Sequence, residues 1–182
     1  MNTKTLALGA AVALSSVAAA DVTVEFAGAT WAGFNFSNLT DIFGGFTGTL
    51  TGVSVNAVLD ASTSFTYADD LCVYVDPLPL SGGGLLQVGG FSNLGAAQRV
   101  FWGNGASSAP GTTVVDTVAV NPIVFSGSVT DPAIWLGNGY GASGTSGTWT
   151  GSITLIGVNA VPAPGAAALL GLAGLVARRR KA

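Results

Sequence analysis

The feature that most limits how this chain can fold is the alternation of apolar and polar residues along most of its length. It is clearest in residues 47–59, where Val53, Val55 and Ala57 fall on one face of an extended segment. No segment between residues 21 and 160 has a convincing 3.6-residue period, and the chain's 27 glycines disfavour helices throughout. The pattern therefore predicts strands.

Further strands are predicted wherever a short alternating or apolar run is bounded by Gly, Pro, Asn or Ser. These runs are residues 22–26, 71–75, 85–88, 99–102, 112–120, 123–129, 133–136 and 148–158. In the last run Ile153, Leu155 and Gly157 are expected on one face, whereas residues 35–41 are expected to form a loop or turn. Seven to nine short strands predict an all-β fold, a single β-sandwich of jelly-roll type.

Residues 1–20 have the layout of a secretory signal peptide. Lys4 precedes an apolar run, and Ala18 and Ala20 supply the small residues of a cleavage site. This predicts export through the secretion translocase and leaves residues 21–160 as the folded domain.

Residues 161–182 contain three parts in order. Two prolines, which disfavour helix before them, precede an uncharged run of 13 residues rich in Ala and Leu, and a basic cluster follows. The proline motif is Val161, Pro162, Ala163 and Pro164, and the basic cluster is Arg178, Arg179, Arg180 and Lys181. The run favours a helix that partitions into lipid, with the cations held on the cytoplasmic side, but it is shorter than the roughly 20 residues of a comfortable span.

This tail resembles the PEP-CTERM sorting signal of Gram-negative bacteria, also catalogued as the ice-binding protein C-terminal domain. In that family an exosortase recognises a Pro-Glu-Pro motif, a hydrophobic helix and an Arg cluster; here Ala163 stands in place of Glu. The resemblance implies a protein tethered to the inner membrane until an exosortase-like enzyme processes it, and then located at the cell surface or in the extracellular matrix. A simple C-terminal membrane anchor is the alternative.

The charge of the predicted domain differs sharply from that of the whole chain. All nine acidic residues lie in residues 21–160, where Arg99 is the only basic residue, so nine against one gives a net charge of −8. The whole chain has a net charge of −3 because the other five cations lie in the two end segments. So acidic a domain cannot neutralise a phosphate backbone, which excludes nucleic-acid binding, and it disfavours anionic lipid.

The residue types present leave little room for catalysis. The chain has no His and one cysteine, Cys72, so a Ser-His-Asp or Cys-His arrangement, the usual zinc sites and an internal disulfide are all excluded. Cys72 lies in an apolar run and is expected to be a small buried hydrophobe. Since no spacing singles out a carboxylate pair, the sequence predicts that the protein is not an enzyme.

Two groups of residues are candidate binding sites. Asp69, Asp70 and Asp76 flank a predicted strand and are a candidate Ca²⁺ site, with solvated turn carboxylates as the alternative. Trp102 and Tyr140, each in a Gly- and Asn-rich stretch, are candidate stacking platforms for a glycan, with core filling as the alternative. The predicted function is that of a structural or interaction protein at the cell surface or in the matrix; a module that binds exopolysaccharide is the alternative.

The order of motifs between residues 47 and 158 is similar to that of bacterial P-domains, which are jelly-roll modules that accompany subtilisin-like proteases. Such domains carry an alternating aliphatic strand, an Asp-Leu strand that ends in a Pro loop, and Gly-Thr-Trp before a closing strand. The counterparts here are residues 53–59, 70–77 and 146–149, although the closing strand lacks the family's Asp-rich segment. The resemblance supports the expected fold and implies no activity.

Overall fold

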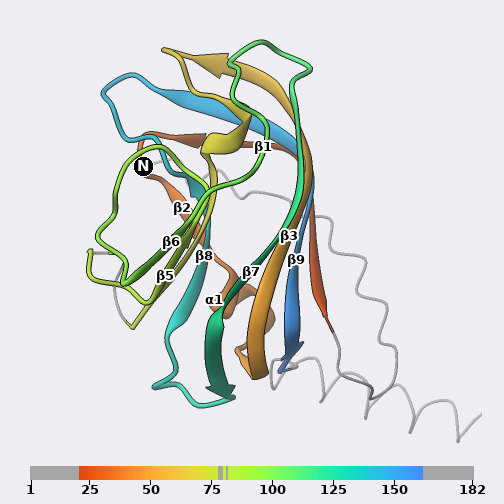
Figure 1. The fold of residues 1–182 in the computed structure, drawn as a ribbon, viewed down its shortest axis with the longest axis vertical. Helices are drawn as coiled ribbons and strands as arrows, with labels where there is room; N and C mark the ends of the chain where they lie inside the picture. The colour runs from red at the N-terminus through yellow and green to blue at the C-terminus, as the bar shows by residue number, and fades with distance from the viewer. Residues whose placement is uncertain (1–20, 78–79, 81, 162–182) are drawn as a thin grey trace, which may run out of the picture.

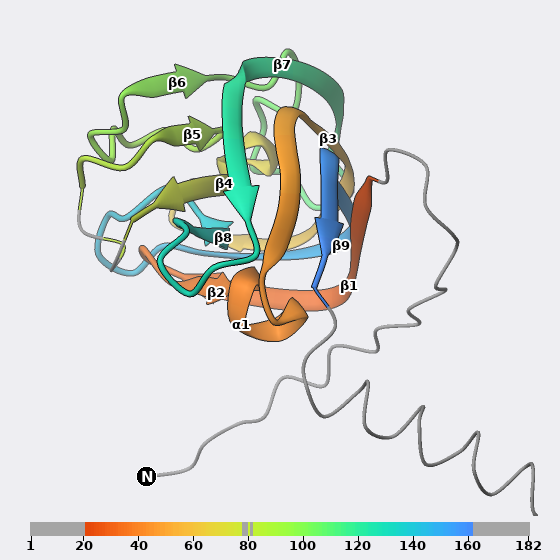
Figure 2. The same ribbon diagram turned by 90° about the horizontal axis from the view of Figure 1, so that it is seen from below.

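The computed structural model describes residues 21–77, 80 and 82–161, which form two facing β-sheets (Figures 1 and 2). The all-β prediction is therefore confirmed. The predicted signal peptide and the tail from Pro162 onward lie outside the described residues. Within the described part of the chain, no helix is long and apolar enough to cross a membrane.

No two neighbouring strands of the first sheet are consecutive in the sequence, whereas the second sheet contains the consecutive strands β4, β5 and β6. The first sheet has the order β1-β9-β3-β7 and consists of β1 (Val22–Ala32), β9 (Ser146–Ala160), β3 (Phe46–Thr63) and β7 (Thr113–Ser126), all antiparallel. The second has the order β2-β8-β4-β5-β6 and consists of β2 (Phe36–Asn38), β8 (Ala133–Asn138), β4 (Leu71–Asp76), β5 (Leu86–Val88) and β6 (Gln98–Val100). Here β5 and β6 are parallel and the other pairs antiparallel. The helical elements are α1 (Leu39–Phe43) and the 3-10 turn η1 (Ala68–Asp70).

The first sheet buries one face and exposes the other. In β1 the side chains of Val22, Val24 and Phe26 point into the core. A bulge then shifts the pairing register between Phe26 and Ala29, so that Ala29 and Trp31 stay on the inner face. The bulge shifts the phase of the alternation by one residue, so the unbroken sequence pattern covers only residues 22–26 of β1.

The inner strands of the second sheet, β4, β5 and β8, are buried on both faces. Leu71, Val73 and Val75 of β4 belong to the core, yet Cys72 and Tyr74 on the opposite face are also fully buried. The chain that follows β4 covers that face, and the Tyr74 hydroxyl accepts from the amide of Gly84 (3.0 Å) and donates to the carbonyl of Leu94 (3.1 Å). Cover on both sides accounts for the continuous apolar run of β4 and for the predicted burial of Cys72.

Three expectations about local structure are wrong. Residues 112–120 and 123–129 are not two strands, because β7 continues past Pro122 at an irregularity between the pairs Leu50–Ile123 and Gly52–Ala119. This is tolerated because β7 is an edge strand, where proline does not interrupt a sheet.

The other two corrections concern the expected loop at residues 35–41 and the expected inner face of the last strand. Residues 35–41, expected as a loop, contribute β2 and α1, whose N-terminus is capped by Asn38. In β9 the register of pairing with β3 changes beside Gly157, which has a φ of 90°. Val158 is therefore buried where Gly157 was expected, after Ile153 and Leu155.

Candidate functional site

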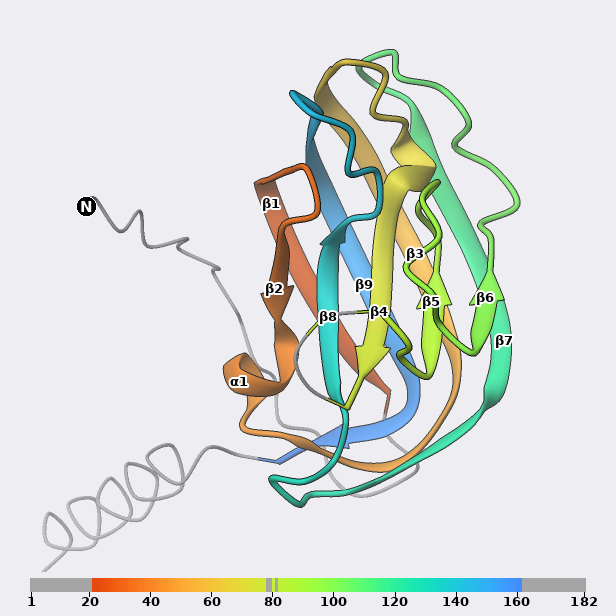
Figure 3. The same cartoon turned by 90° about the vertical axis from the view of Figure 1, so that its left-hand side faces the viewer.

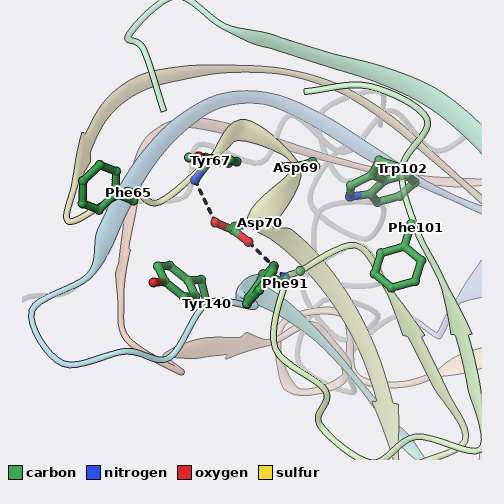
Figure 4. Close-up of a pocket in the computed structure, with 9 residues that line it drawn as sticks. Phe65, Tyr67, Asp69, Asp70, Phe91, Phe101, Trp102 and Tyr140 are labelled. Carbon is green, nitrogen blue, oxygen red and sulfur yellow. Dashed lines mark hydrogen bonds between the residues drawn. The ribbon is translucent and has the colours of Figure 1, made fainter. Parts of the chain in front are cut away.

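A pocket lies at one end of the sandwich, where the connections before β4 and after β5, β6 and β8 meet. They meet because β4 begins where β8 ends, with Leu71 paired to Asn138, and because Val88 and Val100 end β5 and β6 side by side. Figure 3 shows η1 at this end above the second sheet. The pocket has a volume of about 250 Å³ and is lined by Phe65, Tyr67, Asp69, Asp70, Gly90, Phe91, Phe101, Trp102 and Tyr140 (Figure 4).

Exposed aromatic side chains are concentrated around this pocket. In the described chain the exposed aromatic side chains are Phe34, Phe65, Tyr67, Phe91 and Phe101, and all but Phe34 line the pocket. Phe65 and Phe91 are about three-quarters exposed, at 75% and 74%. Apolar surface gathered in one place on a soluble domain marks a binding site more often than apolar residues scattered singly.

A strained turn holds Phe65 in solvent. Ser64 and Phe65 both have positive φ, 51° and 63°, and the amide of Thr66 donates to the carbonyl of Thr63 across the turn (3.3 Å). A bulky residue in the left-handed region costs roughly 1–3 kcal/mol and persists only where the surroundings impose it. The conformational cost at Phe65 is not offset by burial of its ring, which is exposed beside the pocket.

Asp70 joins two of the pocket loops. Its Oδ2 accepts a hydrogen bond from the amide of Tyr67 (2.7 Å) and its Oδ1 accepts one from the amide of Phe91 (3.0 Å), as Figure 4 shows. The residue is only 3% exposed. Burial raises the pKa of Asp70 to about 6, although the two amide hydrogen bonds oppose the shift; Asp69 adds to it. Burial also raises the pKa of Asp69.

Trp102 forms an inner wall of the pocket. It lies in the loop after β6, because that strand ends at Val100 and the predicted strand of residues 99–102 is therefore two residues too long. It is only 6% exposed and packs against the core. Its Nε1 donates to the carbonyl of Leu71 (2.7 Å). Gly89 has a φ of 71°, and a Cβ there would collide with both the indole and that carbonyl, so glycine is required for Trp102 to reach Leu71. Of the two alternatives for Trp102, an exposed stacking platform or a core-filling side chain, its burial favours core filling.

Tyr140 is a partly buried member of the same pocket. It lies in the loop after β8, and its ring meets Phe91 edge to face, with centroids 5.7 Å apart and an interplanar angle of 87°. Trp102 and Tyr140 are therefore brought together with Asp69 and Asp70, although the sequence presented these residues as two separate candidate sites.

Asp76 does not join the other two predicted calcium ligands. It ends β4 whereas Asp70 precedes it, so six residues at about 3.3 Å each put them roughly 20 Å apart. Among the described residues no group of three or more Asp, Glu, Cys or His side chains is placed to hold a metal ion. A single Ca²⁺ site made by Asp69, Asp70 and Asp76 is therefore wrong.

Arg99 supports the pocket from behind its aromatic wall. Its Nη2 donates to the carbonyl of Gly90 (3.2 Å) and to that of Phe91, and its guanidinium lies 4.4 Å from the centroid of the Phe101 ring. These contacts hold the loop after β5 in place. The cation is therefore engaged by the protein's own carbonyls and by one ring.

Sequence reasoning missed three aromatic lining residues, Phe65, Tyr67 and Phe91. Two signals were present in the chain. Phe65 and Tyr67 lie four and two residues before Asp69, the first of two adjacent carboxylates, and Phe91 follows two glycines. Aromatic residues in such polar or glycine-rich connections are poorly placed to fill a core, which makes them candidates for a surface site.

The pocket has to be interpreted from its own geometry. Its elements are an end position on the sandwich, a ring of aromatic side chains and two neighbouring carboxylates. No protein-family model matches this chain, and no curated protein or solved structure does so either.

Proposed function

We propose that this chain is an exported, non-catalytic protein of the cell surface or extracellular matrix whose β-sandwich binds carbohydrate in an exopolysaccharide. The clustering of exposed aromatic rings around the end pocket carries the proposal. The apolar faces of sugar rings stack on aromatic side chains, and their hydroxyl groups donate to carboxylates such as Asp69. Pockets with mostly aromatic walls and a few convergent polar groups are typical small-ligand sites.

The arrangement of the carboxylates favours binding over hydrolysis. A glycosidase places two carboxyl groups on either side of the bond that it cleaves. Asp69 and Asp70 are instead adjacent in η1, and both oxygens of Asp70 accept backbone hydrogen bonds that hold two loops together. Asp70 therefore serves the shape of the pocket, which is the role of a residue in a binding module.

Export and sorting are proposed from the two ends of the chain. The signal peptide of residues 1–20 and the PEP-CTERM-like tail support delivery to the inner membrane, followed by processing near Pro164 by an exosortase-like enzyme. Mass spectrometry of the protein from its native cell tests this, and a C-terminus close to Pro164 is expected. A chain that still ends beyond Lys181 would overturn processing and leave a simple membrane anchor.

We also infer that the sandwich is a jelly roll. With β6 set aside, strands β1, β3, β7 and β9 form one sheet, and β2, β4, β5 and β8 form the other. Successive strands thus pass from sheet to sheet except between β4 and β5, which is the alternation of an eight-stranded jelly roll, with β6 added at an edge.

Retention on immobilised exopolysaccharide from the native cell tests the carbohydrate proposal. The wild-type protein should be retained, and Phe91→Ala and Tyr140→Ala should each weaken retention at least tenfold because they remove rings from the pocket wall. Val124→Ala is the matched control, since Val124 is 70% exposed on β7 and outside the pocket. The proposal would be overturned if Phe91→Ala and Tyr140→Ala were retained as well as Val124→Ala, or if the wild-type protein were not retained at all.

A further inference from the structure

The polar groups around the end pocket are mostly hydrogen-bond acceptors. The carboxylates of Asp69 and Asp70 only accept when ionised, and the Nε1 of Trp102 already donates to Leu71. Among the lining residues that the structure describes, the hydroxyls of Tyr67 and Tyr140 are the remaining side-chain donors. A neutral sugar hydroxyl needs both donors and acceptors, whereas an ammonium group only donates, so the lining suits an ammonium group better.

The aromatic walls have the same preference. The face of an aromatic ring carries partial negative charge and attracts a cation within about 6 Å of the ring centroid, by roughly 0.5–2 kcal/mol, with tryptophan the strongest. Six of the described lining residues are aromatic. One of these rings, Phe101, already has the guanidinium of Arg99 at 4.4 Å, so the structure uses this interaction at the pocket margin.

The charge around the pocket is not neutralised by the protein. No Lys or Arg is among the described lining residues, and Arg99 is directed to the carbonyls of Gly90 and Phe91. Asp70 is buried with only two amide donors on its oxygens, and Asp69 is next to it. Residues 21–160 as a whole carry a net charge of −8, which raises the local concentration of cations. A bound cation would supply the missing countercharge.

We propose that the end pocket binds an ammonium group borne by a sugar, as in a deacetylated amino-sugar residue of a polysaccharide. This inference rests on the proposed carbohydrate-binding function and names the class of sugar. The ammonium group donates to Asp69 and Asp70 while the ring of the sugar lies against the aromatic walls. The volume of about 250 Å³ is just below the roughly 300–1,000 Å³ of drug-sized sites, so the pocket takes one residue of a chain.

Calorimetric titration of the full chain with three probes tests the inference. The probes are a glucosamine oligomer, its fully N-acetylated counterpart and choline, whose quaternary ammonium group has the charge but no N–H donors. The glucosamine oligomer should bind at least tenfold more tightly than the acetylated one, because acetylation removes the charge. Choline should bind more weakly than the glucosamine oligomer, since it can contact the rings but cannot donate to the carboxylates.

Two single-charge variants locate the effect. Asp69→Asn should weaken binding of the glucosamine oligomer about tenfold and leave the acetylated oligomer unchanged. Asp69 is partly exposed, so this substitution does not carry the folding risk of altering Asp70. Glu25→Gln removes the same charge from the exposed face of β1, far from the lining residues, and should leave both affinities unchanged. An equal loss in both variants would mean that only net charge matters and would overturn the pocket assignment.

The possible results separate the two proposals. Equal binding of both oligomers, unaffected by Asp69→Asn, would overturn the ammonium inference and leave carbohydrate binding standing. Binding of choline alone, weakened by Asp69→Asn, would support the ammonium chemistry but overturn a sugar as its source. If none of the three probes binds and exopolysaccharide is still retained, the ammonium inference fails on its own; if retention fails too, both proposals fail.

Discussion

The outer faces of the two sheets differ in exposure: that of the first sheet is in water, and that of the second is covered by chain. The first sheet leaves its outer face in water, where hydroxyls pair across strands, as between Thr23 and Thr154 (2.9 Å) and between Thr30 and Thr148 (2.8 Å). The outer face of the second sheet is covered by chain, and Tyr74 there is fully buried. The loop after β5 covers this face through Leu94 and lines the pocket through Phe91, so the cover of the sheet and the candidate site depend on each other.

Gln87 shows how the cover and the site are connected. It lies between the core residues Leu86 and Val88 and therefore points to the outer face of the second sheet, where it is fully buried. Its Nε2 donates to the carbonyls of Gly89 (3.0 Å) and Ser92 (2.8 Å). Its Oε1 accepts from the amide of Leu94 (3.0 Å). One buried amide thus fixes the loop that carries Phe91 into the pocket.

The largest effect is expected at the core between the sheets. Trp149 of β9 is fully buried on the inner face of the first sheet, and its Nε1 donates to the carbonyl of Ala68 (3.2 Å). Trp149→Ala should lower the free energy of unfolding by about 3–5 kcal/mol, because it leaves a cavity and an unpaired carbonyl. Urea denaturation followed by circular dichroism measures this. A loss below about 1 kcal/mol would contradict the packing described for the core.

A smaller but still large effect is expected on the covered face of the second sheet. Gln87→Ala should destabilise the fold by about 2–3 kcal/mol, because it leaves buried backbone groups of the loop unpaired, and should also weaken retention on exopolysaccharide. Gln98→Ala on β6 is the control: Gln98 is only partly buried and its Oε1 accepts one hydrogen bond, from Asn121. If the two variants lose equal stability, the outer face of the second sheet is no better covered than its edge.

This difference between the sheets also explains what the sequence could predict. The strands of the first sheet can be recognised in the sequence by their alternation, because polar residues such as Thr23 and Ser54 occupy the face that is in water. In the second sheet β4 is visible as an apolar run, but β2 has only three residues and no pattern of its own. Chain cover over Gln87 comes from tertiary structure, which no period in the sequence encodes.

The pocket was only partly predictable for a related reason. Tyr140 and Asp70 could be identified as candidates by residue type, but their meeting depends on strand order, which brings together loops 70 residues apart in sequence. The exposure of Phe65 depends on a turn with two positive φ values, which neither Ser nor Phe favours. The burial of Trp102 depends on the space that Gly89 leaves open.

The covered sheet should also make stability depend on pH through Asp70. Its pKa is raised from the ordinary 3.8 to about 6, so the folded state holds the proton more tightly than the unfolded state. This contribution is fully present below about pH 4 and is lost as the pH rises through about 6. Asp70→Asn should therefore remove a fall in stability between these pH values, measured as the difference between wild-type and variant urea midpoints.

Other nearby groups affect that difference little. Asp69, whose raised pKa acts in the same direction, is present in both proteins and largely cancels. Burial moves the pKa of the Cys72 thiol upward and away from this window. If the wild-type protein and Asp70→Asn keep a constant difference from pH 4 to 7, then the carboxylate of Asp70 is more hydrated than its 3% exposure implies.

The smallest effect is expected on the open face of the first sheet. Thr23→Ala removes a hydroxyl whose partner, Thr154, can turn to water instead, so stability should change by no more than about 0.5 kcal/mol. Val24→Ala, one residue further along β1, removes two buried methyl groups and should cost about 2 kcal/mol. Thermal or urea denaturation of the pair compares the two faces of one strand. Similar losses of stability in both variants would mean that a hydroxyl pair on the open face stabilises β1 as strongly as a buried side chain on its inner face. The two sheets would then differ only in the loops that cover them.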